Sequence, residues 1–388
     1  MNTPIRILLV TPCSPFSPQS GTHQRTALLH EALEQIGPTD VLIVAPSDAP
    51  THAKRAADPR IRSELFWRPS ALDFFYKYKP ENFRCDEHST EELDFREYDL
   101  IVGRYLNPIC KLHLPKDIPT IVDLDDWGKT YGISRGCSPA AIVQRLKHHY
   151  AHWLARKQLA RFDGFFFVSR RDSLKEPLLA SEVLPNIPFF APAQLLPDTA
   201  TKNILFVGAL WYGPNACGID HFLENCWSRI RSAVPAATLT LVGAASPIIR
   251  RRWEEHPGVA TTGFLDDLVE AYRSAAFSIA PIYFGGGTNI KVVESLAFGR
   301  TCVTTPHCAA AFQDDLVAGG GISVAGDDSA FSDLCIRLLR DDSMRRKQAN
   351  QGYKLVNSRY NRAQFTCSVL RLSEKILAAK QHKAKIPT

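Results

Sequence analysis

The stretch PIYFGGGTNIKVVESLAFGR, residues 281–300, decides the fold predicted for this chain. It continues an apolar run from residue 277, and it joins three consecutive glycines to a helical pattern that a further glycine ends. Three glycines let the backbone approach a ligand without interference from Cβ atoms, and the next helix offers unpaired N–H groups and a positive dipole end. The stretch therefore predicts a strand, a turn and a helix that bind an anion such as a diphosphate. A glycine loop made only for tight packing is the alternative.

Two charged residues lie on the helix predicted over residues 290–298. Lys291 falls in the first turn, where its ammonium group would face bound phosphates. Glu294 lies three residues further on the same side of the helix, and a carboxylate there can accept two hydrogen bonds from a ribose diol. The pair predicts a site for a nucleotide with a diphosphate.

The same alternation of apolar strands and helices continues on both sides of this stretch. A strand, a helix and a second strand in sequence imply parallel strands with right-handed crossovers. We therefore predict an α/β fold with two doubly wound, Rossmann-like domains facing a central cleft. The strands are predicted at residues 5–11, 40–45, 98–103, 119–124, 165–169, 204–208, 237–243, 277–281 and 301–305.

A stretch rich in proline and poor in charge, residues 184–201, is the predicted linker between the domains. We expect an N-terminal domain over residues 1–195 and a C-terminal domain over residues 202–358. Residues 359–388 have a helical pattern and are expected to form a C-terminal helix that packs back on the N-terminal domain, followed by a disordered tail.

Residues 281–300 resemble the donor-site motif of the group 1 glycosyltransferases, also called family 4, which are retaining enzymes with the GT-B fold. Glu294, Ala297 and Gly299 match the motif, and an apolar strand follows as in the family. The resemblance implies a nucleoside diphosphate sugar donor held mainly by the C-terminal domain, and a glycan or glycolipid acceptor on the N-terminal domain. It further implies that the departing diphosphate helps to take up the acceptor proton, and it implies no cofactor.

Other stretches carry the same resemblance across nearly the whole chain. Gly208 ends the strand that opens the donor domain and turns toward the phosphates. Gly263 and Phe264 resemble the turn whose backbone reads the nucleobase. Gly21 lies where relatives place a glycine in the first loop, close to both substrates, although an ordinary turn glycine is the alternative.

One departure concerns the donor sugar. The position eight residues before Glu294 is Gly286, where the family has a glutamate that contacts the transferred sugar. We expect the backbone amides of Gly287, Thr288 and Asn289 to take over those contacts.

A second departure concerns the phosphates. The basic pair that many relatives have shortly after Gly208 is replaced by WYGPN, residues 211–215. Lys291 is then the main cation expected at the phosphates, with the arginine run at 250–252 as a further contributor.

Three carboxylates, Asp123, Asp125 and Asp126, end the strand predicted at 119–124. Burying an unpaired carboxylate is costly, so they are expected to face a polar cleft or to pair with a base, and a cleft is favoured. The resemblance places Asp125 where many relatives have a histidine near the anomeric centre. There it would orient the acceptor hydroxyl or stabilise positive charge on the sugar ring, with capping of the next helix as the alternative. Metal binding is the weaker interpretation, and we expect no metal.

Composition excludes several classes of protein. Hydrophobic residues make up 45% and charged residues 22%, values typical of globular proteins, and no apolar run approaches the length of a membrane-spanning helix. The ten cysteines form no CxxC pair, which indicates reduced thiols in a reducing compartment. We expect a cytoplasmic protein that binds no nucleic acid.

The formal charge of +6 permits a peripheral contact with the inner face of the membrane through basic surfaces. Residues 139–162 are a helical pattern with apolar positions at Val143, Leu146, Tyr150 and Trp153 and interleaved bases. We expect this helix to bury its apolar side in the core; a membrane or acceptor contact is the alternative.

These observations together predict a retaining, metal-independent glycosyltransferase that acts in polysaccharide or glycolipid biosynthesis. Two alternatives stay open. One is a nucleotide-sugar binding protein without transfer activity, which Gly286 and the missing basic pair favour. The other is a sugar-nucleotide epimerase of the same fold.

Overall fold

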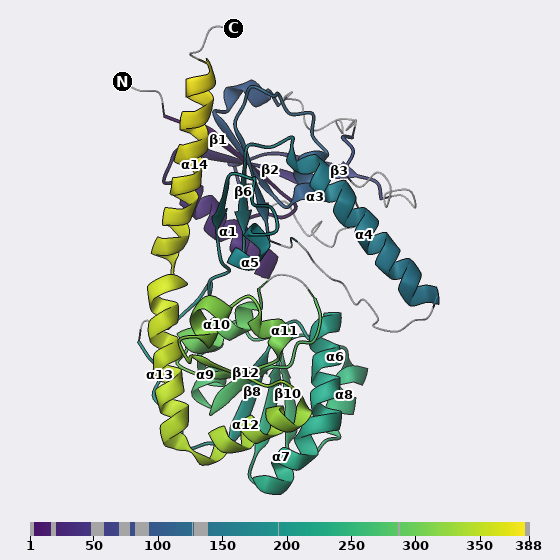
Figure 1. The fold of residues 1–388 in the computed structure, drawn as a ribbon, viewed down its shortest axis with the longest axis vertical. Coiled ribbons are helices and arrows are strands. Elements are labelled where there is room, and N and C mark those ends of the chain that lie inside the picture. The colour runs from purple at the N-terminus through teal and green to yellow at the C-terminus, as the bar shows by residue number, and fades with distance from the viewer. Residues whose placement is uncertain are drawn as a thin grey trace. The chain divides into compact units, whose positions relative to one another are not determined.

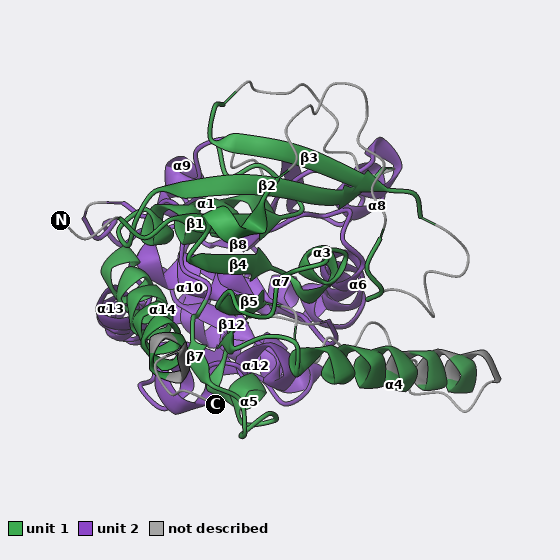
Figure 2. Cartoon of the chain, turned by 90° about the horizontal axis from the view of Figure 1, so that it is seen from above, with its two compact units in different colours: residues 1–129, 133–185, 362–388 green, residues 130–132, 186–361 purple. Residues whose placement is uncertain are grey.

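The computed structural model describes residues 4–16, 21–47, 58–69, 78–81, 93–125, 127, 139–192, 194–285 and 288–384. These residues form two compact units (Figure 2). Unit 1 contains the described residues up to 185 together with those from 362 onward, and unit 2 contains residues 186–361.

Unit 1 is built on a seven-stranded sheet with the order β3-β2-β1-β4-β5-β6-β7, in which every neighbouring pair is parallel. The inner strands are mostly apolar and almost entirely buried, because helices cover both faces of such a sheet. The order reverses between β1 and β4. The strands are β1 (Ile7–Thr11), β2 (Thr39–Pro46), β3 (Ile61–Trp67), β4 (Leu100–Arg104), β5 (Thr120–Leu124), β6 (Gly164–Phe167) and β7 (Ser181–Val183).

The helices of unit 1 include α14, the last helix of the chain, which packs against α1 and β7 (Figure 1). The tail expected after α14 lies largely outside the described residues. The helices are α1 (Gly21–Leu33), the 3-10 turn η2 (Phe95–Glu97), α3 (Leu106–Cys110), α4 (Pro139–Leu159), α5 (Arg170–Ser173) and α14 (Arg362–Ala384).

The expectation that α4 buries its apolar side in the core is wrong for most of the helix. Val143, Leu146 and Trp153 are exposed, and among the apolar side chains of α4 that the structure describes, only those near the C-terminal end, such as Ala155 and Leu159, are buried. The reason is the length of the helix, which extends beyond the sheet of unit 1 and projects from it (Figure 2).

Unit 2 repeats the architecture with a six-stranded parallel sheet in the order β10-β9-β8-β11-β12-β13. Its order reverses between β8 and β11. The predicted class, two Rossmann-like doubly wound domains, is confirmed by the two sheets. The strands are β8 (Asn203–Val207), β9 (Thr238–Val242), β10 (Val259–Gly263), β11 (Phe277–Ala280), β12 (Cys302–Thr304) and β13 (Ile322–Val324).

The helices of unit 2 follow the strands in alternation, as right-handed crossovers between parallel strands require. They are α6 (Gly213–Phe222), η3 (Leu223–Trp227), α7 (Ser228–Ala233), α8 (Pro247–Glu254), α9 (Val269–Arg273), α10 (Ile290–Ala297), α11 (Pro306–Ala309), η4 (Gln313–Val317), α12 (Asp328–Arg340) and α13 (Asp342–Arg359).

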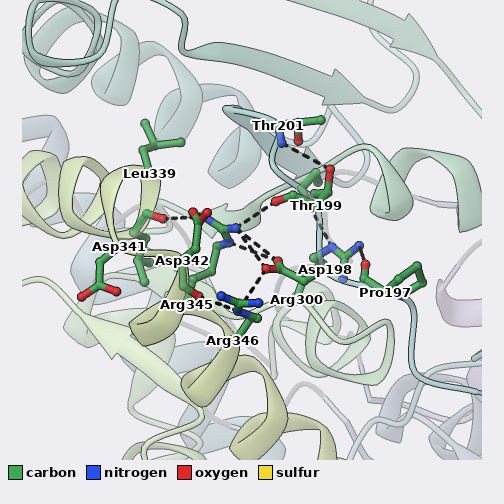
Figure 3. A network of polar contacts seen from close by, with 12 residues as sticks. Pro197, Asp198, Thr199, Thr201, Arg300, Leu339, Asp341, Asp342, Arg345 and Arg346 are labelled. Carbon is green, nitrogen blue, oxygen red and sulfur yellow. Dashed lines mark hydrogen bonds and ion pairs between the residues drawn. The ribbon is translucent and has the colours of Figure 1, made fainter.

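Two buried arginines fasten the first residues of unit 2 to its body (Figure 3). Arg300 donates to the carbonyl oxygen of Pro197 at 2.7 Å, and also to that of Ala275 at 2.7 Å. Arg345 bonds the carboxylate of Asp198 and donates to the carbonyl oxygen of Thr199 at 2.8 Å. Buried carbonyl groups cannot bond to water, and the two arginine side chains donate to them instead. These bonds fix the path of the chain where it enters β8.

No helix within the described part of the chain has both the length and the apolar character needed to cross a bilayer. The eight described cysteines are unpaired thiols, six of them buried.

Candidate functional site

The site of unit 2 lies at the carboxyl ends of β8 and β11, where the strand order reverses. Ligands of open parallel sheets bind at such a point, because the loops of the two strands diverge there. Gly208 follows β8, and its backbone lies so close to that of Gly243 that a Cβ on Gly243 would fall 1.8 Å from the Gly208 oxygen. The chain from β11 reaches α10 through the predicted glycine turn.

The turn is described on both sides of Gly286 and Gly287, which lie outside the described residues. Gly285 has a φ of 117°, a conformation that favours glycine. Thr288 accepts a hydrogen bond at 2.8 Å from the side chain of Asn186. Asn289 is the N-cap of α10 but makes no side-chain capping bond. The first turn of α10 therefore has backbone N–H groups that can donate hydrogen bonds to a bound anion.

Lys291 extends from α10 to Gly208. Its Nζ donates to Asn215 Oδ1 at 3.0 Å, and Asn215 in turn donates to the carbonyl oxygen of Ala209 at 2.8 Å. A Cβ on Gly208 would lie 3.3 Å from Lys291 Cε and 3.1 Å from Asn215 Nδ2. Burial lowers the pKa of Lys291, and the nearby thiols and Glu294 oppose the shift. An anion beside this ammonium group would compensate the burial.

Glu294 lies one turn further along α10 and is held by a residue from another helix. The hydroxyl of Tyr272, at the end of α9, donates to Glu294 Oε1 at 2.9 Å. Burial raises the pKa of Glu294 to about 7, while the Tyr272 bond and Lys291 act in the opposite direction. Glu294 as a whole residue is only partly buried.

The loop after β10 carries the residues expected at the nucleobase. Gly263 has a φ of 80°, and its carbonyl oxygen accepts a bond from the backbone of Gly243 at 2.8 Å. Phe264 follows with 64% of its surface exposed. Because β10, β9 and β8 are neighbours in the sheet, this loop lies at the same edge as Gly208.

The arginine run of α8 is engaged elsewhere. Arg250 bonds Thr261 through its side chain at 2.8 Å, and Arg252 forms an ion pair with Asp220. Because both side chains are engaged in these contacts, the structure does not favour the phosphate binding expected of Arg250 and Arg252.

Unit 1 gathers charged side chains at the carboxyl ends of β4 and β5. Asp123 is buried and bonds Arg25 in a bidentate pair at 2.8 and 2.9 Å, with Arg104 on its other side at 3.1 Å. Asp125 pairs with Arg104 at 2.7 Å. The sequence favoured a cleft over pairing with a base, and the structure pairs both Asp123 and Asp125 with arginine. Asp126 lies outside the described residues.

Tyr105 adds a strained backbone to this cluster. It is the only described residue other than glycine with a positive φ, 67°, and such strain persists where the surroundings enforce it. Its amide donates to the carbonyl oxygen of Asp123 at 3.1 Å, and Arg104 lies over its ring at 3.9 Å. The Tyr105 hydroxyl is 3.4 Å from Asp125. The fixed ring and guanidinium orient Asp125.

Gly21 begins α1, and among the described residues, its chain neighbours aside, no atom lies within 4 Å of the place where its Cβ would stand. Packing against the described residues therefore does not require glycine there.

Comparisons with known proteins concern the family and the fold. Residues 201–341 match the family model described as glycosyl transferases group 1. This part of the chain is therefore similar to the group 1 glycosyl transferases. The matched residues contain Gly208, Lys291 and Glu294, around which the unit 2 site is built.

Solved structures resemble this chain over nearly its full length. Sucrose-phosphate synthase from Thermosynechococcus elongatus has a TM-score of 0.68 at 17% identity, covering 97% of this chain and 100% of that one. A glycosyltransferase from Rickettsia africae has a TM-score of 0.64 at 14% identity, with 96% and 98% covered. HepE of Anabaena in complex with UDP has a TM-score of 0.61 at 14% identity, with 96% and 100% covered. These likenesses show that the chain has the GT-B fold. No curated protein matches the sequence.

The sequence did not reveal the residues that hold the site together. Tyr272 and Asn215 stand 22 and 76 residues away from the side chains they bond. Their places follow from which loops meet at the sheet edge, and spacing along the chain carries no signal of that.

Proposed function

We propose that this glycosyltransferase transfers a sugar from a nucleoside diphosphate sugar to an acceptor hydroxyl with retained anomeric configuration and without a metal ion. The observation that carries the proposal is the arrangement of Lys291 and Glu294 at the carboxyl edge of the unit 2 sheet. One side chain supplies positive charge beside Gly208, and the other supplies a carboxylate one helical turn away.

Lys291 and the first amides of α10 would bind the diphosphate. Both interact most strongly with the charge that develops when the bond to the sugar breaks, so they would stabilise the leaving group. Glu294 would accept hydrogen bonds from the ribose, while Gly263 and Phe264 would contact the base. Retention rests on the resemblance of residues 281–300 to a retaining family, in which the diphosphate helps to take up the acceptor proton.

Asp125 is proposed to orient the acceptor hydroxyl. Its pairing with Arg104 at 2.7 Å and its contact with Tyr105 favour a fixed carboxylate that accepts a hydrogen bond. We propose a glycan or glycolipid as the acceptor, as part of the synthesis of a polysaccharide or glycolipid. This class follows from the family resemblance.

A nucleotide panel tests the donor site. Melting of the protein is measured with UDP-, GDP- and ADP-glucose; a ligand at 100 times its Kd adds about 2.7 kcal/mol of stability. The variant K291E/E294A should lose this stabilisation, and unchanged stabilisation would exclude the site. Arg251→Glu, a charge reversal at an exposed position of α8 in the same unit, is the matched control.

Release of free nucleotide or transfer of labelled sugar then separates catalysis from binding. Tight binding with neither transfer nor slow hydrolysis of the donor would favour the nucleotide-sugar binding protein. Interconversion of one sugar nucleotide into another would favour the epimerase.

We also propose a peripheral membrane contact through α4, supported by its exposed apolar side. Tyr150 and Trp153 stack at 5.7 Å between ring centres, and Lys157 lies 3.6 Å from the centre of the Trp153 ring. Aromatic rings beside bases are suited to an anionic bilayer surface. Sedimentation with phosphatidylglycerol vesicles should exceed that with phosphatidylcholine vesicles and should fall in Trp153→Glu. Equal sedimentation with both lipids would contradict the contact.

A further inference from the structure

The phenol of Tyr272 is buried in unit 2 with its hydroxyl directed at Glu294. The side chain has no exposed surface, and its oxygen lies 2.9 Å from Glu294 Oε1. The ring stacks on Phe298 with 4.4 Å between centres and an angle of 16°. On the backbone side, Arg300 donates to the Tyr272 carbonyl oxygen at 2.9 Å. Tyr272 is therefore held at its ring, its backbone and its hydroxyl.

This arrangement prevents a pairing that the helix would otherwise favour. Residues three apart on a helix are neighbours, and a lysine and a glutamate at that spacing attract each other. Lys291 and Glu294, both described, form no ion pair within 4.0 Å; Lys291 instead bonds Asn215, and Glu294 bonds Tyr272. Each of the two groups is held by a neutral partner, so neither is neutralised by an ion pair with the other.

The chemistry of the bond defines what Tyr272 contributes. The phenol donates a hydrogen bond to Oε1 of Glu294, and this bond favours the ionised form of the carboxyl group. The other oxygen keeps its lone pairs. A ribose offers two adjacent hydroxyl groups as donors, and a carboxylate in a fixed orientation binds them better than one that rotates.

We propose that Tyr272 is a positioning residue that orients Glu294 toward the ribose of the donor. The inference rests on the proposed function, because it assumes that Glu294 binds the nucleotide. Tyr272 itself is buried behind the carboxylate and acts through it.

The test is a calorimetric titration of wild type and Tyr272→Phe with UDP, GDP and ADP. The substitution keeps the ring and its stacking on Phe298 and removes only the hydroxyl. Loss of a hydrogen bond to a charged group should weaken binding about 10-fold. Tyr360→Phe is the matched control, because Tyr360 of unit 2 donates to the carboxylate of Asp315 in the same way, away from α10. It should leave nucleotide affinity unchanged.

Deoxynucleotides separate positioning from a general loss of structure. With the 2′-deoxy and 3′-deoxy forms of the nucleotide that binds best, the effect of Tyr272→Phe should shrink toward 2-fold, since part of the contact it supports is already absent. In a Glu294→Ala background the substitution should have no further effect. The same 10-fold loss with every nucleotide and in both backgrounds would overturn the inference.

The pH dependence gives an independent measure. The Tyr272 bond opposes the burial that raises the pKa of Glu294. Tyr272→Phe should therefore move the midpoint of the pH profile of nucleotide affinity to higher pH, and an unmoved midpoint would count against positioning. If Glu294→Ala binds like wild type, or if no nucleotide binds wild type, the proposed function fails together with the inference. If Glu294→Ala loses affinity and Tyr272→Phe does not, the inference alone fails.

Discussion

Substituting Glu294 by glutamine should stabilise the ligand-free protein, and the gain should depend on pH. The carboxylate is shielded from water beside α9, and its pKa is raised from 4.5 to about 7. A shift of this size corresponds to at most about 3 kcal/mol between the two protonation states, and the partial exposure of Glu294 reduces the expected value to roughly 1–2 kcal/mol.

The sign follows from where the proton is bound. Between pH 4.5 and about 7, folded Glu294 holds a proton that the unfolded chain has released. Wild-type stability therefore falls as pH rises through this window and levels off above it. Glutamine does not titrate, so the difference between Glu294→Gln and wild type should be near zero at pH 4.5 and largest at pH 8.

Wild type and Glu294→Gln are unfolded in urea at half-unit pH steps, and a probe of unit 2 monitors the unfolding. Because all other groups titrate in both proteins, the difference isolates Glu294. Glu255→Gln, at an exposed position in the same unit, controls for the loss of a carboxylate as such. A difference that stays constant from pH 5 to pH 8 would refute the reasoning. A gain in stability accompanied by weaker nucleotide binding would indicate that the burial serves the ligand.

Three further predictions concern other parts of the molecule. Gly208→Ala should weaken nucleotide binding about 10-fold in calorimetry by displacing Lys291, with melting changed little; unaltered affinity would contradict that contact. Arg300→Met should destabilise unit 2 by about 3–5 kcal/mol in denaturant, because several buried carbonyl groups lose their donor, and a loss under 1 kcal/mol would show that they find others. Asp125→Asn should lower the rate of sugar transfer about 100-fold without changing donor affinity, whereas equal rates would assign Asp125 to the structural pair with Arg104.

The inner strands of both sheets could be predicted from sequence because they are buried on both faces and read as apolar runs. Three of the four edge strands, β3, β7 and β13, gave no such run. β3 contains Arg62, Ser63 and Glu64, and β7 has three partly exposed residues, since an edge strand meets solvent on one side. The helix α4 shows the opposite failure, because its apolar spacing predicted burial and the structure exposes it.

Only part of the candidate donor site could likewise be predicted from the sequence. Lys291 and Glu294 lie on one helix, so their spacing predicts that they act together. Tyr272 and Asn215 come from other elements, and no pattern along the chain connects them to α10. The roles of Gly208 and Gly263 were predicted from the family resemblance and stay predictions; Gly263 has a positive φ, which favours glycine.

Residues 211–215 lack the basic pair of many relatives, and Asn215 in this stretch instead accepts a hydrogen bond from Lys291. An acidic residue at 215 would place Lys291 equally well but would neutralise its charge, and the ammonium group would then attract a diphosphate less. A neutral amide fixes the same position and leaves the charge whole. Burial meanwhile makes that charge costly in the free protein, as the lowered pKa of Lys291 shows. A bound diphosphate would remove this cost, and the recovered free energy would add to the affinity for the ligand. The attraction of a second, exposed cation would be weakened by water and salt, so one buried lysine can take the place of the pair.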